Sequence, residues 1–185
     1  PIRFFKSHKI ISSNFTIRHV FESSGTTQNN TSRHYIEDLE FYKQVSSRIF
    51  LDTFGLIEGA VIIGLLPSYL ERNNSSLVYM VDHFIESSHR SESDFYLHNY
   101  EQLYQLLKAL DETKNIYLFG VTFALLEFAQ KYKINNDNFV ILETGGMKGK
   151  GSEMVREELH EILGEGFTSS RITSEYGMTE LLSQA

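Results

Sequence analysis

The sequence predicts an α/β protein with a layered, mainly parallel sheet that is flanked by helices. Short continuous apolar runs, which are typical of buried strands, alternate with longer segments whose apolar residues recur at helical spacing. Glycine, proline and polar clusters separate these segments. Strands separated by helices pair in parallel through crossover connections, so the alternation favours a parallel sheet.

The first predicted helix covers residues 36–50, and Gly55 is placed to end it. A buried strand is predicted at 60–66, a continuous apolar run that Pro67 ends. The helical spacing at 36–50 is carried by Ile36, Leu39, Tyr42, Val45, Ile49 and Phe50.

Two further helices are predicted in the middle of the chain. Ser75 can cap the first, which has apolar residues on one face, and residues 87–94 form a polar loop after it. Asn99 and Gln102 have the spacing of a capping box for the second. The apolar positions are Val78, Val81 and Ile85 in the first helix, and Tyr100, Leu103, Leu107 and Leu110 in the second.

The last third of the chain continues the alternation. Residues 116–119 predict a strand, and Gly120 turns the chain into a helix. A strand at 139–142, a glycine-rich loop and a helix at 152–163 follow, and 171–173 is the last predicted strand. The whole chain, 1–185, is interpreted as a single domain.

Composition limits the classes of function. A net charge of −7 argues against a nucleic-acid partner, which needs a basic surface. The absence of cysteine excludes disulfides, thiolate metal sites and a thiol nucleophile within these residues. The longest apolar stretch, 59–66, is too short to span a bilayer, and no secretion signal is recognised, so we expect a cytoplasmic protein without a membrane span.

A hydroxyl-rich loop near the start of the chain has the composition of a phosphate-binding loop. It consists of Ser23, Ser24, Gly25, Thr26 and Thr27. Glycine lets the backbone approach a phosphate closely, and serine and threonine add hydroxyl donors. The same residues also dominate ordinary polar turns, so an isolated match leaves both interpretations open.

A second motif near the end of the chain combines four groups suited to a nucleotide. Tyr176 offers a face for stacking adenine, and Gly177 lets the backbone pass close to the nucleotide. Thr179 can donate to the α-phosphate, and the Glu180 carboxylate suits Mg²⁺. A strand-to-helix junction with Thr179 as N-cap is the alternative.

A glycine-rich loop between a predicted strand and a predicted helix supplies the third element, with Gly145 and Gly146 at its start. Loops of this kind border the crevice at the carboxyl ends of strands, where α/β folds bind ligands. The spacing matches neither a P-loop nor the GxGxxG pattern. A solvated βα loop is the alternative interpretation.

Taken together, these motifs and their order resemble the adenylate-forming superfamily. The chain is more specifically similar to the acyl-protein synthetase family, the long-chain-fatty-acid–protein ligases of bacterial bioluminescence. The resemblance extends over almost the whole chain, and the segments that carry it are residues 21–27, 65–72, 119–126, 143–149 and 174–185.

The resemblance implies that ATP and Mg²⁺ activate a long-chain fatty acid to an acyl-adenylate, which then transfers its acyl group to a protein acceptor such as a reductase. It implies that Ser23 to Thr27, Gly145, Gly146, Tyr176 and Gly177 bind the nucleotide. It assigns Thr179 and Glu180 to catalysis, with Glu180 as the metal ligand.

Three departures from the family pattern lead us to expect that these residues do not complete a turnover alone. Gln28 stands where the superfamily loop usually has a second glycine. The ribose-binding acidic residue and the C-terminal domain with its catalytic lysine lie downstream in the superfamily, and so does the acyl-accepting cysteine of the family. The predicted helix at 181–185 begins without reaching a cap, so we expect an N-terminal part of a longer enzyme. A non-catalytic nucleotide-binding or interaction subunit and an acyl- or aryl-CoA ligase fragment are the alternatives.

An acyl chain would need an apolar lining. Residues 119–126 are a candidate for that lining, whereas Phe84, Tyr100, Tyr104 and Phe123 are interpreted as core.

Overall fold

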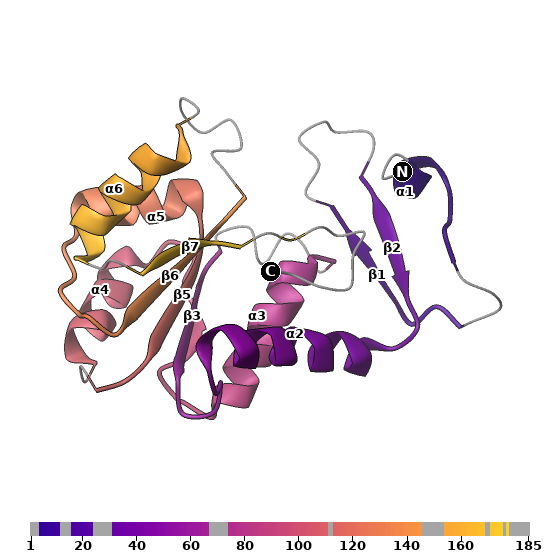
Figure 1. Cartoon of the computed structure of the whole chain (residues 1–185), viewed down its shortest axis with the longest axis horizontal. Coiled ribbons are helices and arrows are strands. Elements are labelled where there is room, and N and C mark those ends of the chain that lie inside the picture. Colours follow the sequence, from indigo (N-terminus) through magenta and orange to yellow (C-terminus); the bar gives the residue numbers. More distant parts are fainter. Residues whose placement is uncertain are drawn as a thin grey trace.

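A computed structural model of the chain describes residues 4–11, 16–23, 31–66, 74–110, 113–145, 154–168, 171–175 and 177. In these residues a five-stranded parallel sheet has the strand order β4-β3-β5-β6-β7 (Figure 1). The predicted α/β fold with a parallel sheet flanked by helices is therefore confirmed. The strands are β3 (Val61–Leu65), β4 (Asp94–Phe95), β5 (Ile116–Val121), β6 (Phe139–Thr144) and β7 (Ile172–Ser174).

Helices cover both faces of the sheet (Figure 1). Tyr117 of β5 packs against Phe50 of α2, whereas Phe139 of β6 packs against Phe167 of α6 on the opposite face. All residues of β3, β5 and β6 are buried, which explains their continuous apolar runs. The helices are α2 (Leu39–Phe54) and α3 (Ser76–Ser88) on the first face, and α4 (Tyr100–Ala109), α5 (Thr122–Lys131) and α6 (Arg156–Phe167) on the second.

The sheet contains a switch point between β3 and β5. The chain leaves β3 through α3 on one face and leaves β5 through α5 on the other, although the two strands are neighbours. In open α/β sheets, ligands bind outside the carboxyl ends of the strands at such a point. We therefore expect a ligand site at the carboxyl edge of β3, β5 and β6.

An antiparallel hairpin, which the sequence analysis does not predict, precedes the sheet. β1 (His19–Glu22) pairs with β2 (Arg33–Ile36), and the Arg33 guanidinium donates to the Glu22 carboxylate at 2.9 Å across the pair. A short helix, α1 (Phe4–Ser7), lies near the start of the chain. Phe21 is fully buried against Tyr42 and Tyr79, so the hairpin is attached to α2 and α3 through aromatic contacts.

Helix α2 begins later than the sequence predicts, whereas its predicted end at Gly55 is confirmed. Ile36 belongs to β2, and Asp38 caps the helix by accepting from the backbone amides of Glu40 and Phe41. The helix continues to Phe54, and the Gly55 amide bonds to Leu51. Aspartate is among the preferred N-cap residues, so a helix start after Asp38 could have been predicted from the sequence.

Other boundaries and one cap also differ from the predictions. Helix α3 extends to Ser88, into the polar loop predicted at 87–94, and the short strand β4 follows it. Asn99 is the N-cap of α4, but its side chain makes no capping bond and instead donates to Gln102 at 3.4 Å. The predicted capping box is therefore wrong. Helix α6 begins at Arg156 and extends to Phe167, rather than covering 152–163.

None of the described helices is both long and apolar enough to cross a membrane.

Candidate ligand-binding site

An apolar cavity of about 230 Å³ lies between the sheet and helices α2 and α3. Neither helix fills this part of the sheet face, because α3 packs mainly on β3 and α2 packs on α3. Aromatic and aliphatic side chains therefore surround an open space over β5, β6 and β7. The apolar lining consists of Ile49, Phe50, Phe54, Met80, Phe84, Phe119 and Leu142.

One end of the cavity is aromatic and rigidly held. The Tyr117 hydroxyl donates to the Phe54 carbonyl at 3.0 Å, and the Tyr117 ring contacts the Phe50 ring edge-on with centroids 4.9 Å apart. Tyr117 is the second residue of β5, so this end lies toward the amino side of the sheet.

The other end of the cavity is polar. Ser174, the last residue of β7, and Glu175, which follows it, line this end. The other polar residues of the lining are Ser46, Thr53 and Thr173. The backbone amide of Glu175 donates to the Glu143 carbonyl at 2.8 Å, which fixes Glu175 at the carboxyl side of β6. The cavity thus runs along the strands from an aromatic floor to a polar mouth at the carboxyl edge, where α/β folds place ligands.

A hydrogen-bonded network connects the carboxyl ends of β5 and β6 to this mouth. The hydroxyl of Thr122, the first residue of α5, donates to the buried Glu143 carboxylate. The Thr144 hydroxyl donates to the Glu175 carboxylate at 2.6 Å. Glu143 bonds toward α5, while Glu175 lines the cavity and accepts from Thr144, the next residue along β6, so the two carboxylates lie on opposite sides of β6.

Tyr42 connects the amino-terminal hairpin to the polar mouth. Burial raises the pKa of Tyr42, and the charge of the nearby Glu175 carboxylate raises it further. The Tyr42 ring also packs on Phe21, two residues before Ser23, with centroids 5.1 Å apart. The hairpin strand that leads into the hydroxyl-rich loop and the strand that leads into the terminal motif therefore approach the same tyrosine.

The Ser23 side chain closes the base of the hydroxyl-rich loop. Its hydroxyl oxygen accepts from the Ser32 amide at 2.9 Å, and its own amide donates to the Ser32 carbonyl at 3.0 Å. Ser23 can still donate its hydroxyl proton. The predicted phosphate ligands Ser24, Gly25, Thr26 and Thr27 lie outside the described residues.

Of the other predicted site residues, the structure describes only Gly145 and Gly177. Gly145 directly follows β6 with a φ of +81°, a conformation that favours glycine, and it is exposed at the carboxyl edge. Gly177 is exposed and follows Glu175 by two residues. Outside the described part of the chain lie Gly146, Tyr176, Thr179 and Glu180.

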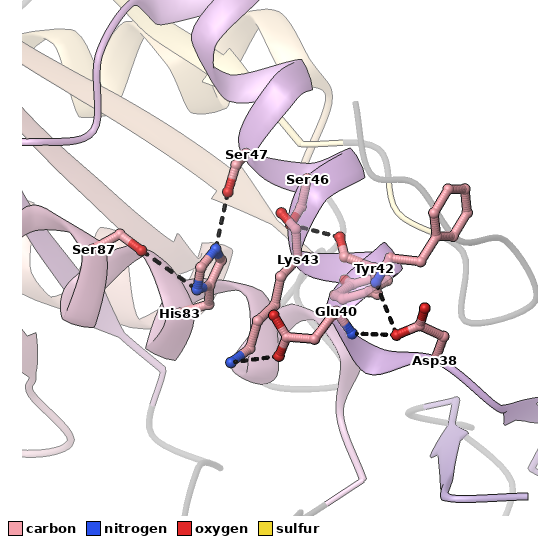
Figure 2. Close-up of polar contacts among 9 residues, drawn as sticks. Asp38, Glu40, Tyr42, Lys43, Ser46, Ser47, His83 and Ser87 are labelled. Atoms are coloured by element: carbon pink, nitrogen blue, oxygen red, sulfur yellow. Dashed lines mark hydrogen bonds and ion pairs between the residues drawn. The ribbon is translucent and has the colours of Figure 1, made fainter.

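A histidine between α2 and α3 holds the two helices that form one wall of the cavity (Figure 2). The Nε2 atom of His83 lies 2.9 Å from the Ser47 hydroxyl, and its Nδ1 atom lies 3.4 Å from the Ser87 hydroxyl. Burial lowers the pKa of His83, and the charge of Lys43 lowers it further. A neutral imidazole both donates and accepts, so His83 can serve the two contacts together.

Among the residues that the structure describes, no three histidine or carboxylate side chains form a group suited to a metal ion. The predicted magnesium ligand, Glu180, is not among these residues.

The fold and the cavity define an α/β protein with a candidate ligand site at the carboxyl edge of a parallel sheet. In comparisons with known proteins, no family model, curated protein or solved structure matched the chain.

The sequence analysis assigned no role to Thr122, Thr144 or Glu175. Thr122 and Thr144 lie just beyond or at the ends of the buried strands β5 and β6, and Glu175 directly follows the short, partly exposed strand β7. Polar residues at this position are the signal that marks the carboxyl edge of a parallel sheet, and it could have identified all three.

Proposed function

We propose that the chain takes part in the ATP-dependent activation of a fatty acid to an acyl-adenylate, whose acyl group then passes to a protein acceptor. The observation that supports this proposal is the direction of the cavity. Its polar mouth lies at Glu175, where the motif implied to bind the nucleotide begins, and its apolar interior leads away from that motif. An apolar tail in the cavity would leave a carboxyl group at the mouth.

The chemistry required is attack by the fatty-acid carboxylate on the α-phosphate of ATP, with release of pyrophosphate. The chain's contribution to this step would be to position the acid and the nucleotide and to exclude water. Ser23 and Gly145 would contact the nucleotide from two sides, and Mg²⁺ bound with ATP would neutralise phosphate charge. The acyl-adenylate would then react with a nucleophile of the acceptor and release AMP.

The test is ATP–pyrophosphate exchange, which measures the first step without any acyl acceptor. We expect exchange that depends on both a fatty acid and Mg²⁺, measured with the natural protein. Absence of exchange across a series of fatty and aromatic acids would refute the proposal.

A second candidate is activation of an aromatic acid for transfer to coenzyme A. The aromatic lining of the cavity favours it, because Phe50, Phe84 and Phe119 could pack on an aryl ring. The volume of about 230 Å³ also exceeds the roughly 150 Å³ of an engineered cavity that binds benzene. Exchange with benzoate derivatives, but not with fatty acids, would favour this candidate.

The orientation of the acid in the cavity, with its carboxylate at the mouth, gives a separate prediction. If the carboxylate lies at the mouth, the Glu175 carboxylate repels it, and Glu175→Gln should strengthen decanoate binding about tenfold. The amide oxygen of the substituted side chain can still accept from Thr144, so the local structure is retained. Decanol, which is uncharged, should bind the variant and the wild type equally; isothermal titration calorimetry without ATP measures both affinities.

The control for this prediction is Glu157→Gln, which removes one exposed carboxylate from the first turn of α6. It makes the same change in net charge away from the cavity and should leave decanoate binding within about twofold of wild type. Equal gains for decanoate and decanol in Glu175→Gln would show that the carboxyl group is elsewhere.

A further inference from the structure

We infer that this half-open cavity selects acids by chain length, that it holds about nine carbons, and that Phe54 forms its floor. The acid that fits is then a medium-chain acid, shorter than the long-chain acids that the sequence resemblance implies. This inference rests on the proposed function in one respect, because it assumes that the ligand's carboxyl group lies at the mouth.

The capacity follows from the cavity volume. An engineered cavity of roughly 150 Å³ holds the six carbons of benzene, so 230 Å³ corresponds to about nine carbons at the same density. A longer acyl chain cannot be enclosed completely. Its additional carbons must leave the apolar lining, or its carboxyl group must move out of the mouth.

The floor is fixed by contacts from two elements. The backbone of Phe54 is held by the Tyr117 hydroxyl at 3.0 Å, and its ring packs against the rings of Phe50 and Tyr117 at centroid distances of 5.2 and 5.6 Å. Phe54 is also the last residue of α2, and the amide of Gly55 bonds back into the helix. The floor therefore cannot retreat without disturbing both α2 and β5.

The mouth is equally well fixed, so the distance between the two ends is defined. Ser46 lies eight residues before Phe54 on α2, which corresponds to about 12 Å along the helix. Glu175, which also lines the cavity, is held by the backbone bond to Glu143 and by the Thr144 hydroxyl. A ligand between two fixed ends is selected by length rather than by polarity alone.

The test is direct binding of saturated fatty acids from hexanoate to hexadecanoate, measured by isothermal titration calorimetry without ATP. We expect affinity to rise about fourfold for each added methylene while the chain is enclosed. The rise should stop at about nine carbons in the wild type. A steady rise through hexadecanoate would overturn the inference.

We call the chain length at which the affinity stops rising the break. Two variants should shift this break in opposite directions. Phe54→Ala opens the floor and should shift the break to acids that are about two to four carbons longer. Leu142→Phe adds volume to the wall and should shift it to shorter acids. If Phe54→Ala does not fold, the milder substitution Phe54→Leu takes its place. Thermal melting of each variant establishes that it is folded.

The matched control is Phe41→Ala, the same substitution on the outer side of α2, where the Phe41 side chain is exposed. A break that is unchanged in Phe54→Ala, or that moves equally in Phe41→Ala, would refute the assignment of the floor. Because these measurements need no nucleotide, a length break without pyrophosphate exchange would retain the inference and reject the activating function. Exchange without a length break would reject the inference and retain the activating function.

Discussion

Replacing Phe167 with alanine should lower the free energy of unfolding by about 3–5 kcal/mol. Phe167 is the last residue of α6 and is fully buried between two other rings. It stacks on Phe128 of α5 at 5.5 Å and on Phe139 of β6 at 5.7 Å, so its removal leaves a cavity where three elements meet. Urea denaturation followed by circular dichroism measures the loss.

Phe41→Ala is again the matched control, because it removes the same atoms from a half-exposed position on α2. We expect a change within about 0.5 kcal/mol there, as for most surface substitutions. A loss below about 1 kcal/mol in Phe167→Ala would contradict the packing described for the α5–α6 layer.

The residues around Phe167 also show why the predicted end of α6 is wrong. A helix that stops at Leu163 avoids Gly164 and Gly166, which are poor helix formers. In the structure the helix continues because α5 and α6 approach closely at Gly166. A Cβ atom there would lie 2.5 Å from the Cβ of Ala129, so tertiary packing requires the glycine that helix propensity disfavours.

The parallel sheet was predictable because each central strand is a continuous apolar run. The hairpin β1–β2 was not, because its strands are only four residues long and contain His19, Arg33 and His34. Its stability comes from Phe21 packing on Tyr42 and from the Glu22–Arg33 pair, which are contacts distant in sequence. Short polar strands of this kind carry little local signal.

The candidate site was predictable only in part. The glycine-rich loop was correctly placed after a buried strand, and Gly145 lies at the carboxyl edge of β6. The cavity itself depends on how far α2 and α3 stand from the sheet, which no sequence pattern specifies. Of the segment 119–126, Phe119 lines the cavity, and Phe84, which was interpreted as core, lines it too.

Replacing Glu180 with glutamine should reduce ATP–pyrophosphate exchange by at least about 100-fold. The magnitude follows from metal sites, where the loss of an outer-shell partner alone costs about 10- to 100-fold. Glutamine keeps the size of the side chain but removes the negative charge that a magnesium ion prefers. Glu180 lies outside the described residues, so this prediction rests on the sequence and on the position of Glu175.

The position of Glu175 limits where the Glu180 side chain can act. The backbone bond between Glu175 and Glu143 fixes the chain at the mouth of the cavity. Five residues of fully extended chain span at most about 18 Å, so the α-carbon of Glu180 lies within that distance of the α-carbon of Glu175. A magnesium ion beside the acid's carboxyl group, where activation requires it, would therefore be within reach of Glu180.

Two measurements separate loss of metal binding from loss of structure in Glu180→Gln. Fatty-acid binding without ATP should equal that of the wild type, because the described residues that line the cavity are unchanged. The Mg²⁺ concentration needed for half-maximal exchange should rise, whereas Glu157→Gln should leave it unchanged. Exchange within about twofold of wild type in Glu180→Gln would remove this residue from the metal site, since loss of a direct ligand should exceed the outer-shell effect.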